Sequence, residues 1–331
     1  DMFKELNIKI LIVLLSDQAG IYFLADIFGN RERSFRSQLV EVDTAKVTDI
    51  YIKIPKENAE ISLSRTGGST DWSVMSGGQK FPADASVVKG ILGQFADLKP
   101  ERVAANSESK WGQYEVSDSA GTRVKLNEGK KELVDIYIGK FSYTQPPQQP
   151  GQQQNPYQQQ RGKMTSFVRL ADEEKVFAVE GFMKMSFQKD INSYRNKSLL
   201  KVNKDDIARL VFSYPGNVTM TVEKNESGKW QMNGMPADST KTVRYLNKIA
   251  KLTSSSFIDP STPKIGMGGY KLNVEGNNFS PVEINAAPTS DTLIKYVITS
   301  SINPAAEFDG AKGKLFEKIF VSETEFLPEV K

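Results

Sequence analysis

The chain has 331 residues, of which 39% are hydrophobic and 25% are charged, so it has the composition of a globular protein and the length of two domains. It contains no Cys and no His. This excludes disulfides, thiolate or imidazole metal sites, Cys nucleophiles and Ser-His-Asp triads. Lys and Arg (43) nearly balance Asp and Glu (40), and the formal charge of +3 does not predict a nucleic-acid-binding surface.

The most apolar stretch, residues 10–28, has the length of a helix that crosses a bilayer. Asp17 near its centre costs about 2.5–3.5 kcal/mol on the insertion scale, against roughly 3–7 kcal/mol gained from its apolar side chains. Basic residues flank the stretch on both sides, so charge alone does not fix its orientation. Since no other stretch is long and apolar enough, we expect residues 1–41 to form an N-terminal anchor helix and linker, with the N-terminus inside. A buried amphipathic helix is the alternative.

Two long stretches of the chain align with one another at a nearly constant offset of 160 residues. The aligned positions are Ile50 with Leu210, Pro55 with Pro215, Trp72 with Trp230, Asp84 with Asp238, and residues 133–138 with 293–298. The same structural unit is therefore expected twice in tandem, over residues 42–182 and 202–331. A linking helix is expected over residues 183–201.

Each unit is expected to combine an antiparallel sheet with one helix, which places the chain in the α+β class. Alternating apolar residues predict a first strand at 47–54, and a hairpin of two further strands follows it. The aspartate of a Pro-Ala-Asp sequence then predicts the N-cap of a helix, at Asp84 and again at Asp238. The remaining strands are expected at 113–116, 123–127 and 132–138 in the first unit and at 270–274, 282–285 and 293–299 in the second.

A segment dominated by Gln and Pro, residues 145–161, has a composition that cannot build a core. It lies between two expected strands of the first unit, so the sequence predicts a solvated insertion in a hairpin. The alternative is a polyproline-type docking segment in which Tyr157 contacts a partner.

No cluster of residues predicts a catalytic, metal or cofactor site. The glycine-rich run at 266–269 precedes a strand rather than a helix, which predicts a turn and not a phosphate cradle. Neighbouring carboxylates such as those at 205–206 fall at turns or helix starts and lack calcium-loop spacing. Trp111 and Tyr114 form, with Tyr157, the candidate ligand or partner surface, although core packing is the stronger expectation for the first two.

Several of these features together resemble a known family. They are the apolar N-terminus, the Trp before Pro-Ala-Asp, the runs Leu-Val-Asp-Ile-Tyr-Ile-Gly-Lys (133–140) and Tyr-Arg-Asn-Lys-Ser-Leu-Leu (194–200), and the second copy. The chain resembles, from about Val42 onward, an uncharacterised bacterial extracytoplasmic repeat-domain family of unknown function. That family is related to the C-terminal region of gliding-motility-type ABC transporter auxiliary subunits. The chain departs from the family at residues 16–18 and at 299–300, where the Ile-Gly-Lys ending is absent.

The resemblance implies a membrane-tethered domain that faces away from the cytoplasm, often encoded beside ABC transporter components. We therefore expect a non-enzymatic protein anchored in the inner membrane, with a periplasmic body that binds a protein partner such as ABC transporter subunits. No cofactor and no nucleic acid are expected. The alternative is a module that binds a cell-envelope glycan or peptide by stacking on Trp111 and Tyr114. A hydrolase working through two carboxylates ranks third, because no catalytic constellation is recognisable.

Overall fold

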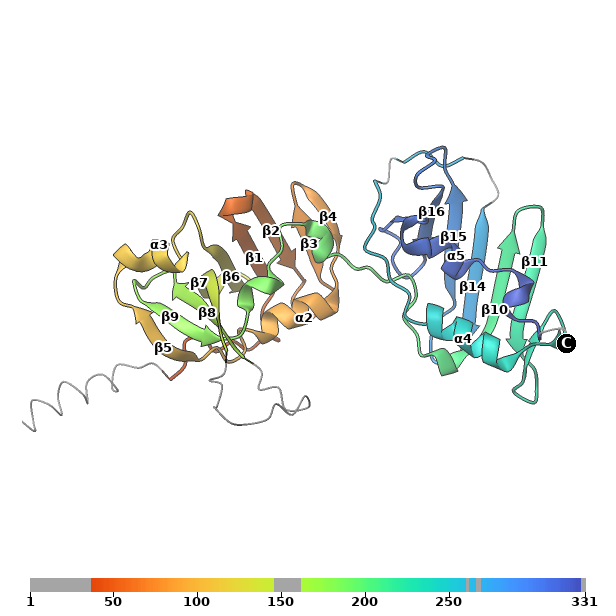
Figure 1. Cartoon of the computed structure of the whole chain (residues 1–331), viewed down its shortest axis with the longest axis horizontal. Coiled ribbons are helices and arrows are strands. Elements are labelled where there is room, and N and C mark those ends of the chain that lie inside the picture. Colours follow the sequence, from red (N-terminus) through yellow and green to blue (C-terminus); the bar gives the residue numbers. More distant parts are fainter. Residues whose placement is uncertain (1–36, 146–161, 260–261, 266–268, 329–331) are drawn as a thin grey trace, which may run out of the picture. The chain divides into compact units, whose positions relative to one another are not determined.

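The computed structural model describes residues 37–145, 162–259, 262–265 and 269–328 (Figure 1). The chain forms two compact units, one of residues 1–60 and 90–187 and one of residues 61–89 and 188–331. The N-terminal anchor expected within residues 1–41 falls almost entirely on residues 1–36, and the Pro/Gln segment on residues 146–161, so both lie outside the described residues. In the described part of the chain, no helix has the length and apolar composition needed to cross a membrane.

Two antiparallel sheets, of nine and eight strands, make up most of the structure, and the helices are few and short. The protein is therefore mostly β with some helix, which confirms the antiparallel sheets expected from the sequence. The α-helices are α2 (Ala85–Gly93), α3 (Trp111–Tyr114), α4 (Ser239–Ile249) and α5 (Leu315–Ile319). The 3₁₀ helices are η1 (Pro55–Glu57), η2 (Glu108–Lys110), η3 (Met183–Ser186), η4 (Ile191–Ser193), η5 (Lys204–Asp206), η6 (Lys312–Lys314) and η7 (Glu323–Glu325).

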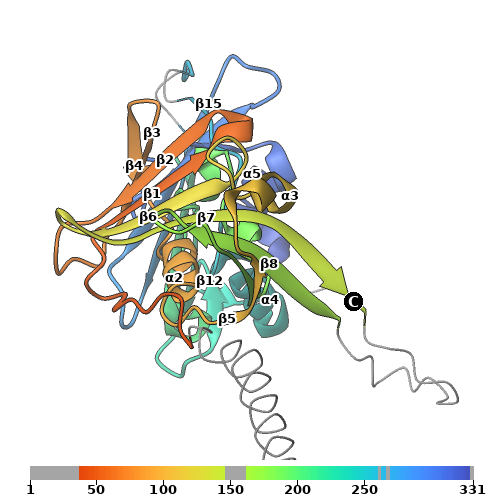
Figure 2. The same cartoon turned by 90° about the vertical axis from the view of Figure 1, so that its left-hand side faces the viewer.

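The strands of the N-terminal sheet follow the order β4-β3-β2-β1-β6-β7-β8-β9-β5. Their bounds are β1 (Asp49–Ile54), β2 (Ala59–Ser64), β3 (Ser73–Ser76), β4 (Gln79–Pro82), β5 (Pro100–Ala105), β6 (Thr122–Glu128), β7 (Lys131–Thr144), β8 (Lys163–Leu170) and β9 (Val176–Glu180). Ile50 and Ile52 are buried while Tyr51 and Lys53 are not, so alternate residues of β1 face the core. Figure 2 shows the ends of β7 and β8 projecting as a two-stranded arm.

The C-terminal sheet has the order β13-β12-β11-β10-β14-β15-β16-β17. Its strands are β10 (Ile207–Tyr214), β11 (Val218–Lys224), β12 (Trp230–Met232), β13 (Met235–Pro236), β14 (Tyr270–Gly276), β15 (Val282–Pro288), β16 (Tyr296–Ser300) and β17 (Phe308–Asp309). Helix α4 and the C-terminal segment complete its core: the Tyr245 ring centre lies 6.0 Å from that of Phe212 and 5.2 Å from that of Phe326. On the opposite face, Arg209 makes ion pairs with Glu223 (3.1 Å) and Glu275 (3.2 Å). One face of this sheet therefore builds the core, and charged pairs line the other.

The two sheets share one pairing scheme. Ile50 of β1 is opposite Leu126 of β6, and Leu210 of β10 is likewise opposite Val274 of β14. The flanking segments also correspond, as four main-chain hydrogen bonds show. They are Leu39 N to Leu98 O (2.8 Å), Leu199 N to Leu252 O (2.8 Å), Asp84 N to Tyr194 O (2.8 Å) and Asp238 N to Phe326 O (2.8 Å). We call residues 39–195 the N-terminal half and residues 199–327 the C-terminal half.

The sequence alignment of the halves is correct at β1 and β10 but wrong further along. The offset falls from 160 at Ile50 and Leu210 to 148 at Leu126 and Val274. β16 holds part of the run 293–298, which the sequence aligns with β7, but it occupies the position of β8 in the pairing order. The reason is that the N-terminal half has a longer β7–β8 hairpin and a longer connection between β5 and β6, neither of which shifts the apolar alternation used for the alignment.

Two expected elements are wrong. The strand expected at 113–116 is replaced by α3, which ends where Glu115 adopts a left-handed conformation (φ 58°). The linking helix expected over 183–201 is replaced by η3, η4 and irregular chain. There the side chain of Asp190 accepts a hydrogen bond from Asn192 N (2.9 Å), and that of Asn196 accepts one from Ser198 N (3.0 Å). Such local bonds compete with helical pairing, so the apolar spacing of this segment does not produce a helix.

Candidate functional site

Trp111 and Tyr114, the expected aromatic surface residues, lie together on α3 and are half-buried. They pack against a small cluster centred on Tyr137 and Phe167, which point away from the face of Ile136 and Ile138. The ring centres of Tyr114 and Phe167 are 4.6 Å apart, and the Tyr114 hydroxyl donates to the carbonyl oxygen of Ala104 (3.1 Å). The second face of the N-terminal sheet is thus covered where α3 crosses it.

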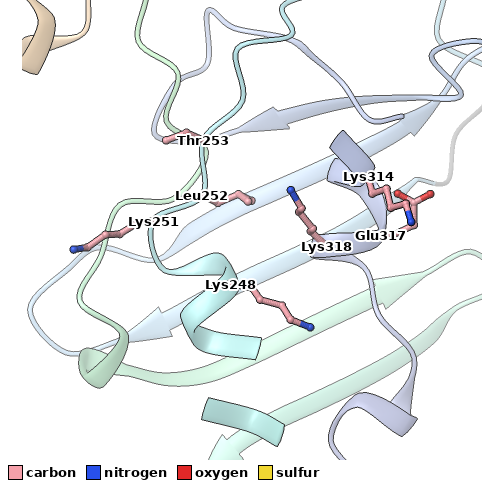
Figure 3. A pocket seen from close by; sticks show the side chains of 7 residues that line it. All are labelled: Lys248, Lys251, Leu252, Thr253, Lys314, Glu317 and Lys318. Atoms are coloured by element: carbon pink, nitrogen blue, oxygen red, sulfur yellow. The ribbon is translucent and has the colours of Figure 1, made fainter. Parts of the chain in front are cut away.

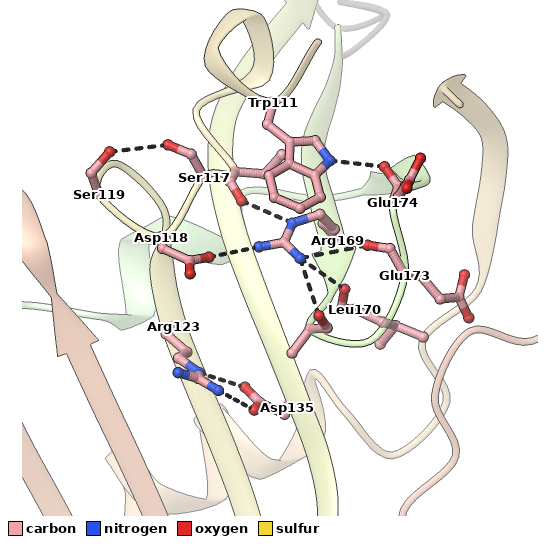
Figure 4. A network of polar contacts seen from close by, with 12 residues as sticks. Trp111, Ser117, Asp118, Ser119, Arg123, Asp135, Arg169, Leu170, Glu173 and Glu174 are labelled. Carbon is pink, nitrogen blue, oxygen red and sulfur yellow. Dashed lines mark hydrogen bonds and ion pairs between the residues drawn. The ribbon is translucent and has the colours of Figure 1, made fainter. Parts of the chain in front are cut away.

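Arg169 is the buried charge at the centre of this cluster, with only 2% of its surface exposed (Figure 4). Its guanidinium carbon lies 3.7 Å from the ring centre of Trp111 and 4.2 Å from that of Tyr137. The acceptors of its hydrogen bonds are the carbonyl oxygens of Val116 (3.1 Å), Leu170 (3.3 Å), Ala171 (3.3 Å) and Glu173 (3.5 Å) and a carboxylate oxygen of Asp118 (3.0 Å). Main-chain acceptors therefore satisfy most of its donors, which fixes the loops around it.

The indole of Trp111 is held from two sides, because its Nε1 also donates to the carbonyl oxygen of Glu174 (2.8 Å). The structure thus brings Trp111 and Tyr114 together on α3, each with a packed neighbour. The third expected surface residue, Tyr157, lies outside the described residues. Arg169 was missed by sequence reasoning, and its only signal is a charge inside the otherwise apolar run 167–170.

A hollow of about 400 Å³ lies beside β7 in the N-terminal half, and several carboxylates line it, among them Glu132 and Asp135. Burial tends to raise the pKa of Asp135, but hydrogen bonds from Arg123 and Lys125 outweigh it and hold this pKa below its usual value. A general acid needs the opposite shift. In the described parts of the chain, no group of three or more carboxylates is arranged to hold a metal ion.

A second hollow, of about 560 Å³, lies in the C-terminal half between the end of α4 and α5 (Figure 3). Its lining residues are Lys248, Lys251, Leu252, Thr253, Lys314, Glu317 and Lys318. The Lys248 ammonium pairs with Glu325 at 2.8 Å. This hollow is cationic, and sequence reasoning missed it because its lysines come from segments more than 60 residues apart.

The arm at the ends of β7 and β8 carries exposed apolar side chains. Tyr143 (53% exposed) is directly opposite Met164 (42% exposed) in the pairing of β7 with β8. Phe141 (44% exposed) lies two residues before Tyr143, and its ring centre is 4.1 Å from that of Phe182. Because side chains alternate along a strand, Phe141, Tyr143 and Met164 share one face of the arm.

Residues 72–145 and 158–266 match the family described as Domain of unknown function (DUF4340). The match covers more than half of the chain, which therefore belongs to this family. It begins at Trp72 before β3 and extends past Trp230 of β12, so it includes one full period of the pairing scheme. It also skips residues 146–157, within the Pro/Gln segment that the sequence predicts to be an insertion. No curated protein and no solved structure matches the chain.

Proposed function

We propose that this chain is a non-enzymatic accessory subunit of an envelope assembly, held at the inner membrane by residues 1–41 with its body in the periplasm. Its partner is an ABC transporter, a choice supported by the resemblance of the sequence to auxiliary subunits of such transporters. The two halves arose by duplication, a step supported by their common strand order. They now differ in what they present to a partner.

The observation that carries this proposal is the apolar face of the β7–β8 arm. Phe141, Tyr143 and Met164 gather there, and large apolar and aromatic side chains of this kind supply the central contacts of protein interfaces. The C-terminal half has no such arm, because β15 ends at Pro288 and β16 begins at Tyr296. The arm is therefore not required by the common fold, which favours a role in binding.

The test is co-purification of the full chain from membranes in mild detergent, after cross-linking, with wild type compared to the double variant Tyr143→Ser, Met164→Ser. Both side chains are largely exposed, so the variant should fold, as circular dichroism will check. We expect ABC transporter subunits to accompany wild type and to fall about tenfold or more with the variant, since two interface anchors are lost.

The matched control is Val218→Ser, Met235→Ser, which removes two side chains of similar exposure (57% and 53%) from β11 and β13. It should retain the partner at the wild-type level. Recovery of the wild-type chain alone in several detergents would refute the proposal, and so would equal recovery of transporter subunits with the arm variant.

A glycan-binding module is a weaker candidate because it depends on ring faces that sugars can stack on. Trp111 carries the Arg169 guanidinium on its ring at 3.7 Å, and Tyr114 packs on Phe167 at 4.6 Å. These contacts reduce the aromatic area that α3 offers to a sugar. We therefore place the partner-binding surface on the arm and not on α3.

A further inference from the structure

We propose that the lysine-lined hollow between α4 and α5 binds a phosphate group. Lys248 comes from the last turn of α4, while Lys314 and Lys318 flank and belong to α5. Figure 3 shows Lys248 and Lys318 directed into the space between the two helices, whereas Lys251 points to the other side. Two segments distant in sequence thus bring ammonium groups to one concave site.

The charges at this hollow do not balance within the protein. Lys248 is paired with Glu325, and Glu317 also lines the site. Among the residues that the structure describes, Lys314 and Lys318 have no ion pair. Like charges brought to one place repel each other, and a bound anion removes that repulsion.

The N-terminal half shows what the same fold has at this place without the charges. Leu98 corresponds to Leu252 by its main-chain hydrogen bonds, so Gln94 corresponds to Lys248. Tyr194 corresponds to Phe326 in the same way, so Ser186 corresponds to Lys318. The side chain of Gln94 donates a hydrogen bond to the Ser186 hydroxyl.

A neutral hydrogen-bonded pair therefore closes this place in one half, and two lysines stand there in the other. A Lys at the end of α4 also interacts favourably with the helix dipole, which is the purely structural explanation for Lys248. That explanation does not extend to Lys314 and Lys318, which lie around α5. Lys314 moreover has a left-handed backbone (φ 55°), an uncommon conformation for a residue other than glycine. The site therefore holds a residue in an unfavoured conformation beside uncompensated charge, both of which are frequent at binding sites.

A phosphate group fits this chemistry. Lys ammonium groups bind phosphate oxygens as point charges, with several donors converging on one group. Thr253, which also lines the hollow, adds a hydroxyl donor. The hollow, at about 560 Å³, has room for a phosphate ester and not only for the bare ion. The phosphate comes either from a soluble ester or from the headgroup of an anionic lipid.

The test is calorimetric titration of the full chain in neutral detergent at fixed ionic strength. Pyrophosphate stands for a soluble phosphate ester and glycerophosphoglycerol for a lipid headgroup. The decisive variant is Lys248→Gln, Lys318→Ser, which installs the pair Gln94 and Ser186 already present in the N-terminal half and so should fold. We expect wild type to bind one of the two probes and the variant to bind it at least about tenfold more weakly.

The control is Lys229→Gln, which removes one positive charge from an exposed turn of the same half. It should bind the probe as wild type does. Preference for pyrophosphate identifies a soluble ester, and preference for glycerophosphoglycerol identifies a headgroup. Binding of neither probe by wild type, or equal binding by the lysine variant, would overturn the proposal.

Discussion

Asp135 is the most strongly paired carboxylate of the N-terminal sheet. Only 10% of its side chain is exposed, and it accepts hydrogen bonds from Arg123 (2.8 Å) and Lys125 (2.9 Å). Burial tends to raise its pKa, but these two donors outweigh burial and lower the pKa. Its charged form is therefore favoured by the folded state. An aspartate in an unfolded chain titrates near pH 3.9.

Asp135→Asn should lower the free energy of unfolding at neutral pH by about 1.5–3 kcal/mol, because hydrogen bonds to a charged group are lost. A folded-state pKa below the unfolded value gives stability that is fully present above about pH 4 and is lost as the pH falls through the folded-state pKa. Urea unfolding of both proteins between pH 2.5 and 8 will measure this. The gap should be constant above pH 5 and should close in acid.

The control is Asp71→Asn, at an exposed aspartate in the turn before β3. It should change the free energy of unfolding by less than about 0.5 kcal/mol. If the gap between wild type and Asp135→Asn were independent of pH, the ion pairs would not be the source of the stability.

Single residues were predicted from the sequence where their partners are close in the chain. Asp84 and Asp238 are N-caps as expected: their carboxylates accept hydrogen bonds from Ser86 N (2.8 Å) and Lys241 N (2.9 Å). Arg169 was not predicted, because its partners on α3 and in the loop 116–118 are about 50 residues away. Sequence spacing carries no information about contacts of that kind.

At the level of elements, α3 depends on a glycine in β7. A Cβ added at Gly139 would overlap the carbonyl oxygen of Tyr114 and lie 2.7 Å from Val116 Cγ1. The C-terminal sheet has Ala287 at the corresponding place, since Ala286 pairs with β16 as Ile138 pairs with β8. The Ile-Gly-Lys sequence is thus explained by the helix that rests on it.

Gly139→Ala should lower the free energy of unfolding by about 1–3 kcal/mol, because α3 must move to make room for the methyl group. The measurement is urea denaturation followed by the fluorescence of the Trp residues. Gly67→Ala is the control, since a Cβ there meets nothing within 4 Å and its φ is not positive. Equal midpoints for Gly139→Ala and wild type would show that α3 does not rest on β7 as described.

The same elements show why some strands and helices were predicted and others were not. β1 and β10 were correct, because six to eight alternating residues specify a strand strongly. The strand expected at 113–116 was wrong because four residues carry too little periodicity to separate a strand from one helical turn. Segment 183–201 was wrong because Asp190 and Asn196 form local turns that an apolar spacing does not reveal.

For the whole molecule, the sequence predicted a repeated unit but not its full register. Matches near 160 were correct at Ile50 and Leu210, where no insertion intervenes. Beyond them, the segment covered by α3 and the long β7–β8 hairpin displace the N-terminal half relative to the C-terminal half. These two additions are also where the halves differ in surface. The functional differences therefore follow the places where the alignment failed.

The C-terminal half has a complete core of its own. All buried residues of its main cluster, from Leu199 to Phe326, come from residues 199–327. Two buried polar residues tie its first strand-like segment to its end: Ser300 Oγ donates to Leu199 O (2.6 Å) and Asn303 Nδ2 to Asn196 O (2.8 Å). A segment that buries its own apolar surface and satisfies its own polar groups meets the conditions for independent folding.

Residues 196–331 expressed alone should therefore fold, with a single cooperative urea transition and a structured near-ultraviolet circular dichroism spectrum. A fragment ending at residue 310 should not, because it lacks α5 and Phe326, whose ring packs 5.2 Å from Tyr245 and 6.0 Å from Phe212. Loss of that aromatic packing and of the hydrogen bond from the Tyr245 hydroxyl to Ile319 O leaves α4 without its cover. If the longer fragment bound hydrophobic dyes and lacked a cooperative transition, the half would need the rest of the chain to fold, and the repeat would not be a folding unit.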